Sequence, residues 1–137
     1  MLKSISSIIF VLWGFQIYSQ SDSLNCLLKT DSLTLQQYYE GADKMPEVSG
    51  GQDLLFKQLQ KLRIPYDDCP GGKIIVSFII ESNGDLTNKK IIKDPCGGKL
   101  GEQVFSLIGD IRWTPGQCKG VNVPVKIHLP VMIDPGK

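Results

Sequence analysis

Residues 73–93 read KIIVSFIIESNGDLTNKKIIK and predict a β-hairpin around which the rest of the domain is built. Two runs rich in β-branched residues flank Asn83-Gly84, a dipeptide that tolerates the positive φ angles of a primed two-residue turn. Strand alternation places four large apolar residues of the first run on one face: Ile74, Val76, Phe78 and Ile80. Because an isolated hairpin is marginally stable in water, the rest of the chain must cover that face.

The second run of the hairpin is poorer in apolar residues and carries Lys89, Lys90 and Lys93. Lysines on a strand discourage pairing with foreign strands, so this run is interpreted as a protected edge of the sheet.

Apolar residues at helical spacing predict a short helix over residues 52–62 and a second helix that begins near Leu100 and ends at Gly109. A last strand is expected over residues 121–133, where apolar residues alternate with polar ones or proline. Chain direction allows this strand to pair antiparallel only with the first strand of the hairpin. The fold class is therefore predicted as α+β, with a three-stranded antiparallel sheet of order 2-1-3 packed on one side by a helix and preceded by a short helix.

Three segments are expected along the chain. Residues 1–20 have a basic residue at Lys3, a mostly apolar stretch over 5–17 and a polar end, the pattern of a signal peptide. A membrane anchor is the alternative, but a span needs about 20 apolar residues and this stretch is shorter. Residues 21–44 form an N-terminal extension that fits either a short helix or a strapped-on segment, and residues 45–137 form the domain. An exported, periplasmic protein is expected.

The four cysteines all follow the expected signal peptide, and an even number in an exported chain indicates disulfides. Cys69 precedes the hairpin and Cys96 follows it, so both lie at its open end. Cys118 lies at the opposite end of the sheet, beyond the roughly 7 Å that a disulfide allows between Cα atoms. The topology therefore predicts the bridges Cys69–Cys96 and Cys26–Cys118.

Composition and titratable residues argue against several classes of function. Lys and Arg number 15 against 14 Asp and Glu, so the chain lacks the positive charge typical of nucleic-acid binders. Its single histidine, His128, stands within the last strand, and the pair Asp67-Asp68 is explained by a turn. We therefore expect no enzyme activity, no cofactor, no metal site and no small-molecule substrate.

Several short motifs over residues 43–133 resemble the carboxy-terminal domain of TonB and TonB-like bacterial proteins. They are Met45-Pro46-Glu47, Gly50-Gly51, Ile64-Pro65 and Arg112-Trp113-Thr114-Pro115-Gly116. The resemblance implies a periplasmic domain that binds a segment of an outer-membrane transporter or another envelope protein by strand addition, in TonB-dependent transport. The chain lacks the family's proline-rich spacer between residues 20 and 45, so a structural or accessory envelope protein without energy transduction is the alternative.

The binding edge is predicted from strand parity. Proline has no N–H and is tolerated where that position faces solvent, and Pro124 and Pro130 share the same parity. Even-numbered residues of the last strand are therefore expected to direct their backbone groups to a free edge. The partner segment is predicted to dock along Val125, Lys126, Ile127, His128 and Leu129.

Overall fold

A computed structural model describes residues 26–64 and 69–133. The segment for which a signal peptide is expected lies outside these residues. The fold is α+β, with two helices and three sheets among the described residues. The elements in chain order are β1 (Leu28–Thr30), β2 (Gln37–Tyr39), β3 (Glu47–Val48), α2 (Gln52–Leu59), β4 (Gly72–Ile80), β5 (Leu86–Lys93), α3 (Lys99–Gly109), β6 (Trp113–Thr114), β7 (Gly116–Cys118), β8 (Val121–Val123) and β9 (Val125–Ile133).

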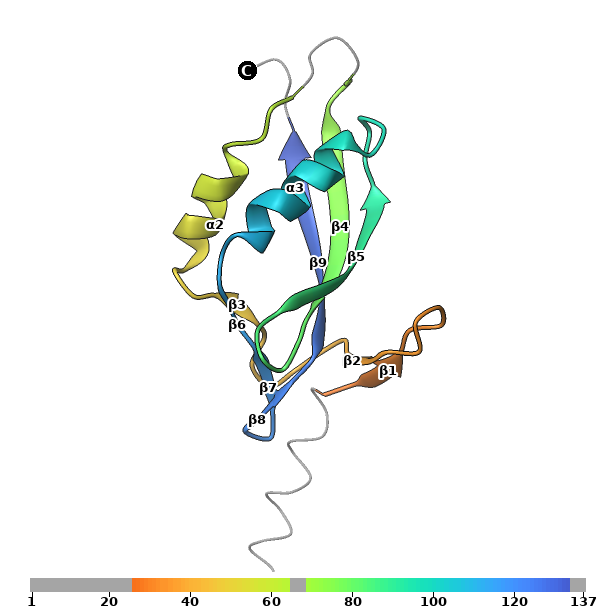
Figure 1. The fold of residues 1–137 in the computed structure, drawn as a ribbon, viewed down its shortest axis with the longest axis vertical. Coiled ribbons are helices and arrows are strands. Elements are labelled where there is room, and N and C mark those ends of the chain that lie inside the picture. Colours follow the sequence, from red (N-terminus) through yellow and green to blue (C-terminus); the bar gives the residue numbers. More distant parts are fainter. Residues whose placement is uncertain (1–25, 65–68, 134–137) are drawn as a thin grey trace, which may run out of the picture.

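The main sheet has the order β1-β2-β9-β4-β5 (Figure 1). Within it, β4 pairs antiparallel with β5 on one side and with β9 on the other, as expected for the hairpin and the last strand. The prediction of a three-stranded sheet is wrong, because the N-terminal extension adds a hairpin of its own. In this hairpin β1 pairs antiparallel with β2, and β2 joins β9 in parallel at Tyr39 and Val125.

The turn between β4 and β5 differs from the primed two-residue turn that was expected. The amide of Gly84 donates to the carbonyl of Glu81 at 2.8 Å, and the amide of Glu81 donates to the carbonyl of Asp85 at 2.7 Å. Gly84 has a φ of 92°, whereas Asn83 is not among the residues with positive φ. These contacts describe a three-residue loop, in which one glycine takes the left-handed position.

The last strand is also shorter than predicted, because it is interrupted at Pro124. Residues Val121–Val123 form β8, which pairs with β7 in a separate two-stranded sheet. β9 begins at Val125 and continues to Ile133. Proline lacks the donor needed to continue a ladder, which accounts for the break at this position.

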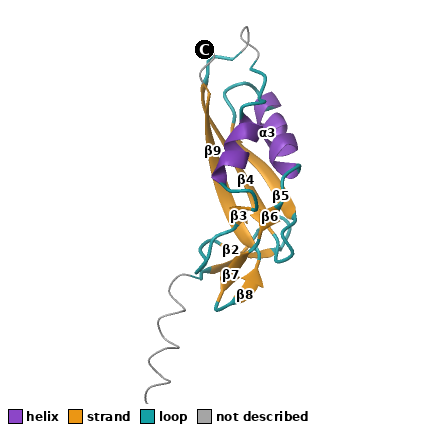
Figure 2. Cartoon of the chain, turned by 90° about the vertical axis from the view of Figure 1, so that its left-hand side faces the viewer, coloured by secondary structure: helices purple, strands orange, loops and turns teal. Residues whose placement is uncertain are grey.

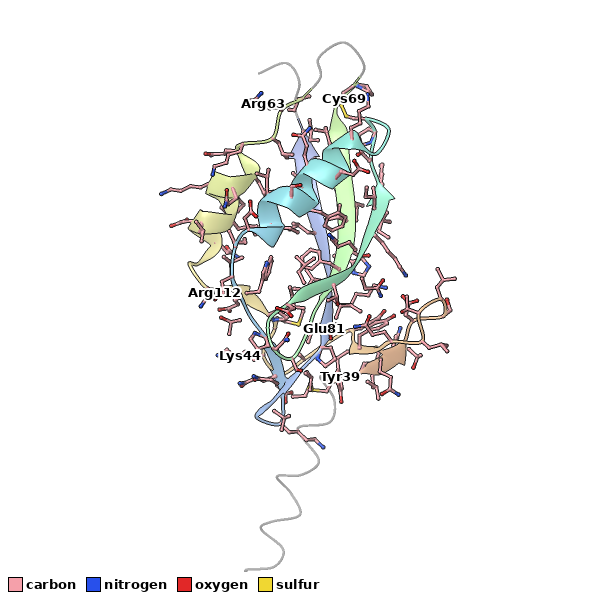
Figure 3. The ribbon with its side chains drawn as sticks, in the orientation of Figure 1. Tyr39, Lys44, Arg63, Cys69, Glu81 and Arg112 are labelled. Atoms are coloured by element: carbon pink, nitrogen blue, oxygen red, sulfur yellow. A yellow bond between two sulfur atoms is a disulfide. The ribbon has the colours of Figure 1, made fainter. Side chains whose placement is uncertain are left out.

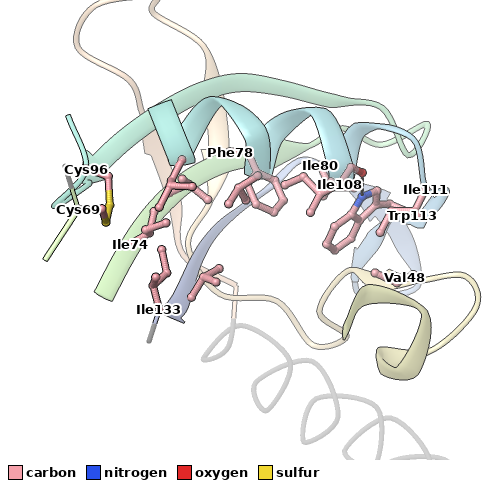
Figure 4. Close-up of a cluster of buried hydrophobic side chains, with 14 residues drawn as sticks. Val48, Cys69, Ile74, Phe78, Ile80, Cys96, Ile108, Ile111, Trp113 and Ile133 are labelled. Carbon is pink, nitrogen blue, oxygen red and sulfur yellow. Dashed lines mark hydrogen bonds between the residues drawn. A yellow bond between two sulfur atoms is a disulfide. The ribbon is translucent and has the colours of Figure 1, made fainter. Parts of the chain in front are cut away.

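One face of the sheet packs against α3 around Phe78 (Figures 2 and 4). The ring of Phe78 meets Trp113 edge-on at 5.4 Å between centroids and Phe105 at 6.4 Å. Trp113 is 8% exposed, and its indole N–H donates to the carbonyl of Ile108 at 3.2 Å. The residues predicted on this face of β4 are all buried here: Ile74, Val76, Phe78 and Ile80.

The opposite face of β4 is buried at Ser77 and Ile79, whereas Ile75 is half-buried and Lys73 is exposed. Residues of the β1–β2 hairpin lie over this side of the sheet. The ammonium of Lys126, which is opposite Ile79, lies 4.8 Å from the centroid of the Tyr38 ring. Tyr38 is itself buried, so the extension packs against the domain.

A partly buried ion pair fixes the tip of this hairpin to β5. Asp31 is 4% exposed, and its carboxylate accepts from the ammonium of Lys90 at 2.6 Å. Lys90 is opposite Ser77 and serves this contact, so the interpretation of all three lysines as edge protection is wrong for this one. The hydrogen bond from Lys90, followed by those from the amides of Thr34 and Leu33, holds the pKa of Asp31 well below its usual range.

Two disulfides close the structure, in the pairing expected from the topology. Cys69 and Cys96 join the open end of the β4–β5 hairpin, with 4.7 Å between their Cα atoms. Cys26 and Cys118 tie the residues before β1 to β7 across 6.1 Å. Two structural disulfides fit an exported protein. Neither helix in the described part of the chain is long and apolar enough to cross a membrane.

Replacing Asp31 with Asn should destabilise the protein near neutral pH, because Lys90 loses its charged partner. A carboxylate whose pKa is lowered on folding stabilises the folded state above its unfolded pKa of about 4, and this contribution is lost as the pH falls below that value. The difference in unfolding free energy between the wild type and Asp31→Asn should therefore shrink from pH 7 to pH 3 in urea titrations. The exposed Asp110→Asn is the matched control. A difference that stays constant with pH would contradict the ion-pair explanation.

Replacing both Cys26 and Cys118 with serine should lower the free energy of unfolding by about 2–4 kcal/mol, because the bridge closes a long loop. The amide of Tyr39, which donates to the carbonyl of Pro124 at 2.8 Å, should then exchange faster with solvent. Denaturant unfolding and hydrogen exchange measure the two effects. Unchanged exchange at Tyr39 would show that the hairpin is held without the bridge.

Candidate functional site

The candidate site is the edge of β9 that faces away from β4. On the β4 side, β9 keeps an unbroken register of nine residue pairs, from Gly72 opposite Ile133 to Ile80 opposite Val125. On the other side, Val125 pairs with Tyr39 of β2. Within residues 26–64 and 69–133, no further strand pairs with this edge beyond Val125. β9 therefore offers a long and regular strand edge for backbone hydrogen bonding.

The backbone of even-numbered residues points to this edge. The amide of Tyr39 donates to the carbonyl of Pro124, which shows that an even residue directs its carbonyl toward β2. Because N–H and C=O groups alternate along an extended strand, the same direction applies to Lys126, His128 and Met132. Pro130 presents only its carbonyl there. This direction agrees with the prediction, made from the positions of Pro124 and Pro130, that the backbone groups of even-numbered residues face the free edge.

The five residues of the predicted docking segment lie in one row on β9, but their environments differ. Val125 is fully buried and pairs with β2. Lys126 lies over Tyr38, whereas His128 is exposed. Ile127 and Leu129 pack against the core on the α3 side. The uncovered part of the edge thus extends from Lys126 toward Met132.

A groove of about 580 Å³ runs beside the carboxyl half of this edge. One wall comes from α2 and the residues after it, through Phe56, Leu59 and Leu62, and the other wall comes from β9 residues that include Met132. Phe56 is 57% exposed and Met132 is 72% exposed. In Figure 3, α2 lies alongside β9, on the side away from β5. Apolar side chains of the groove thus lie next to the backbone groups of β9 that no strand pairs with in the described part of the chain.

The sequence interpretation missed this groove. It used the helical spacing of Leu55, Leu59 and Leu62 to predict a helix, and all three pack against the core. Phe56 lies outside that spacing, and an aromatic residue on the exposed side of a short helix was the available signal. The position of α2 beside β9 depends on tertiary packing, which the spacing does not encode.

The other edge of the sheet, β5, is irregular. Its register against β4 shifts twice, between Ile75 and Val76 and between Ser77 and Ile79. Asn88 in β5 has a φ of 50°, which places it in the left-handed region. Bulges of this kind twist an edge and interrupt pairing, so β5 is a poorer template than β9 for an added strand.

Charged side chains gather where β2 meets β9. Glu40 accepts from the ammonium of Lys29 at 2.8 Å, and this hydrogen bond lowers the pKa of Glu40. The charges of Lys126 and His128 act in the same direction. The amino-terminal end of the edge therefore carries one acidic group, Glu40, among several basic ones, whereas the groove is lined by uncharged residues.

No group of three or more His, Cys, Asp or Glu side chains in the described part of the chain could hold a metal ion. A scan against protein-family models, a search of curated proteins and a search of solved structures each gave no match to this chain.

Proposed function

We propose that this chain is an exported domain that binds an extended segment of another cell-envelope protein by adding it as a strand to β9. The observation that carries the proposal is the regular, unpaired edge of β9 with an apolar groove beside it. In strand addition, backbone hydrogen bonds supply much of the affinity and pockets for alternate side chains supply the specificity.

The surroundings of the edge indicate what the added segment should look like. Backbone groups of His128 and Met132 would pair with it, while Pro130 would accept but not donate. Every second side chain of the segment would point toward the groove lined by Phe56 and Leu59. A segment with apolar residues at alternate positions therefore fits best.

The resemblance to the TonB carboxy-terminal domain supports the same mode of binding and suggests its setting. It implies a periplasmic location and a partner segment from an outer-membrane transporter or another envelope protein, in TonB-dependent transport. The two disulfides are compatible with that compartment. A structural or accessory envelope role is the alternative if the edge of β9 binds nothing.

Replacing His128 with proline should abolish partner binding, because it removes a donor from the middle of the edge. The fold should survive, since the even residues direct their N–H groups away from β4 and Pro130 already occupies an equivalent position. His128→Ala, which keeps the backbone donor, is the matched control. Capture of proteins from detergent-solubilised outer membranes measures binding, and circular dichroism checks the fold. Equal capture by wild type, His128→Pro and His128→Ala would rule out this edge.

Replacing Phe56 with serine should weaken partner binding about tenfold while changing the free energy of unfolding by less than about 1 kcal/mol. The reason is that Phe56 is more than half exposed and contributes its apolar surface to the groove rather than to the core. Titration with a captured partner segment and urea unfolding give the two values. Ile92→Ser, at a 55% exposed position on β5, is the control. If Phe56→Ser binds as well as wild type, the groove takes no part in recognition.

A further inference from the structure

The tip of the β1–β2 hairpin, residues 31–36, presents two leucines to solvent. Leu33 is 82% exposed and Leu35 is 75% exposed, more than any other large apolar residue described. Figure 1 shows the tip standing out from the body of the domain. The groove beside β9 does not include these residues.

Most backbone donors of the tip are satisfied within the tip. The side chain of Asp31 accepts from the amides of Leu33 at 2.8 Å and Thr34 at 3.0 Å. The carbonyl of Asp31 accepts from the amide of Leu35 at 2.9 Å, and the amide of Asp31 donates to Gln36 at 2.8 Å. The amide of Gln36 donates to the hydroxyl of Thr34 at 3.4 Å. Five amides of the tip therefore need no solvent partner.

The tip also carries no exposed charge. Its single ionisable residue is Asp31, which is 4% exposed and paired with Lys90 at 2.6 Å. The other five residues, Ser32 to Gln36, are uncharged. Moving this loop out of water would therefore not dehydrate an exposed charged group of the tip.

Besides being exposed, Leu35 has a backbone conformation that is unfavourable for folding. Its φ is 59°, a conformation that is uncommon for a bulky residue and that asparagine or glycine adopts more easily. Neither the backbone conformation nor the exposure of this leucine favours the fold. Strain of this kind is concentrated at functional positions.

We propose that this tip inserts into the apolar boundary of a lipid membrane. Hydrocarbon offers no hydrogen-bond partners, so a loop enters this boundary at lower cost when most of its amides are satisfied internally and its charges stay outside. A protein pocket can supply donors and acceptors, so a loop that docks in one has less need of the five internal amide hydrogen bonds seen here. Two leucines give weak, reversible attachment, and the inference does not depend on strand addition to β9.

The test is flotation of the purified, disulfide-bonded protein with vesicles of phosphatidylethanolamine and phosphatidylglycerol, and with vesicles of phosphatidylcholine. Replacing Leu33 with Ser and Leu35 with Asn should lower the partition coefficient by at least tenfold on both lipids, because the leucine side chains supply the transfer free energy. Leu35→Asn alone should raise the melting temperature or leave it unchanged, since asparagine relieves the strain. If Leu35 were needed for packing, Leu35→Asn would instead lower the melting temperature.

Val121→Ser is the control, because Val121 is 62% exposed on another hairpin and should not alter flotation. The proposal is overturned if the wild-type protein floats with neither lipid, or if the double variant floats as well as the wild type. Loss of a protein partner by the double variant, without vesicle binding by the wild type, would assign the tip to a protein interface and would also overturn it.

Discussion

The structure depends on β4 being buried on both of its faces. Phe78 and Ile80 require cover on one side, and Ser77 and Ile79 are equally inaccessible on the other. One helix cannot cover both sides of a strand. The helix α3 covers the first face. On the opposite face, Lys126 and Lys90 contact Tyr38 and Asp31 of the β1–β2 hairpin. The N-terminal extension is thus part of the folded domain.

Covering the second face with so short a hairpin requires anchors other than a large apolar area. Lys90 lies on that face opposite Ser77, and a basic residue at a covered position needs a partner. Asp31 supplies it and at the same time organises the hairpin loop through the amides of Leu33 and Thr34. The bridge from Cys26 to Cys118 holds the other end of the hairpin. The ion pair and the disulfide together replace the core that three-residue strands cannot provide.

Local patterns in the sequence were sufficient to predict the two helices, the β4–β5 hairpin, its antiparallel pairing with β9 and the placement of the bridges. The predictions were wrong or incomplete where one sequence pattern fits two different structures. The run Ile74–Ile80 was interpreted by alternation as a strand with one covered face, but an almost continuous apolar run is typical of a strand covered on both. The segment Asp31–Gln36 contains an Asp followed by Thr34, a signal for a side-chain-capped turn, yet its contact with Lys90 joins residues that are distant in sequence. Likewise, parity correctly gave the direction of the β9 edge, whereas the groove beside it depends on where α2 packs.

The outer edges of the long strands β5 and β9 differ in how they are protected against pairing with foreign strands. An unpaired strand edge can pair with foreign strands, and β5 meets this risk with bulges. β9 follows Pro124 and contains Pro130, and its register with β4 is uninterrupted over its whole length. The N-terminal hairpin closes the edge at Val125, and the bridge at Cys118 fixes the point at which the hairpin begins. A domain that protects one edge and covers the start of the other has limited its exposed template to a defined length beside one groove. In the proposed strand addition, a segment that extended past Lys126 toward Val125 would meet β2.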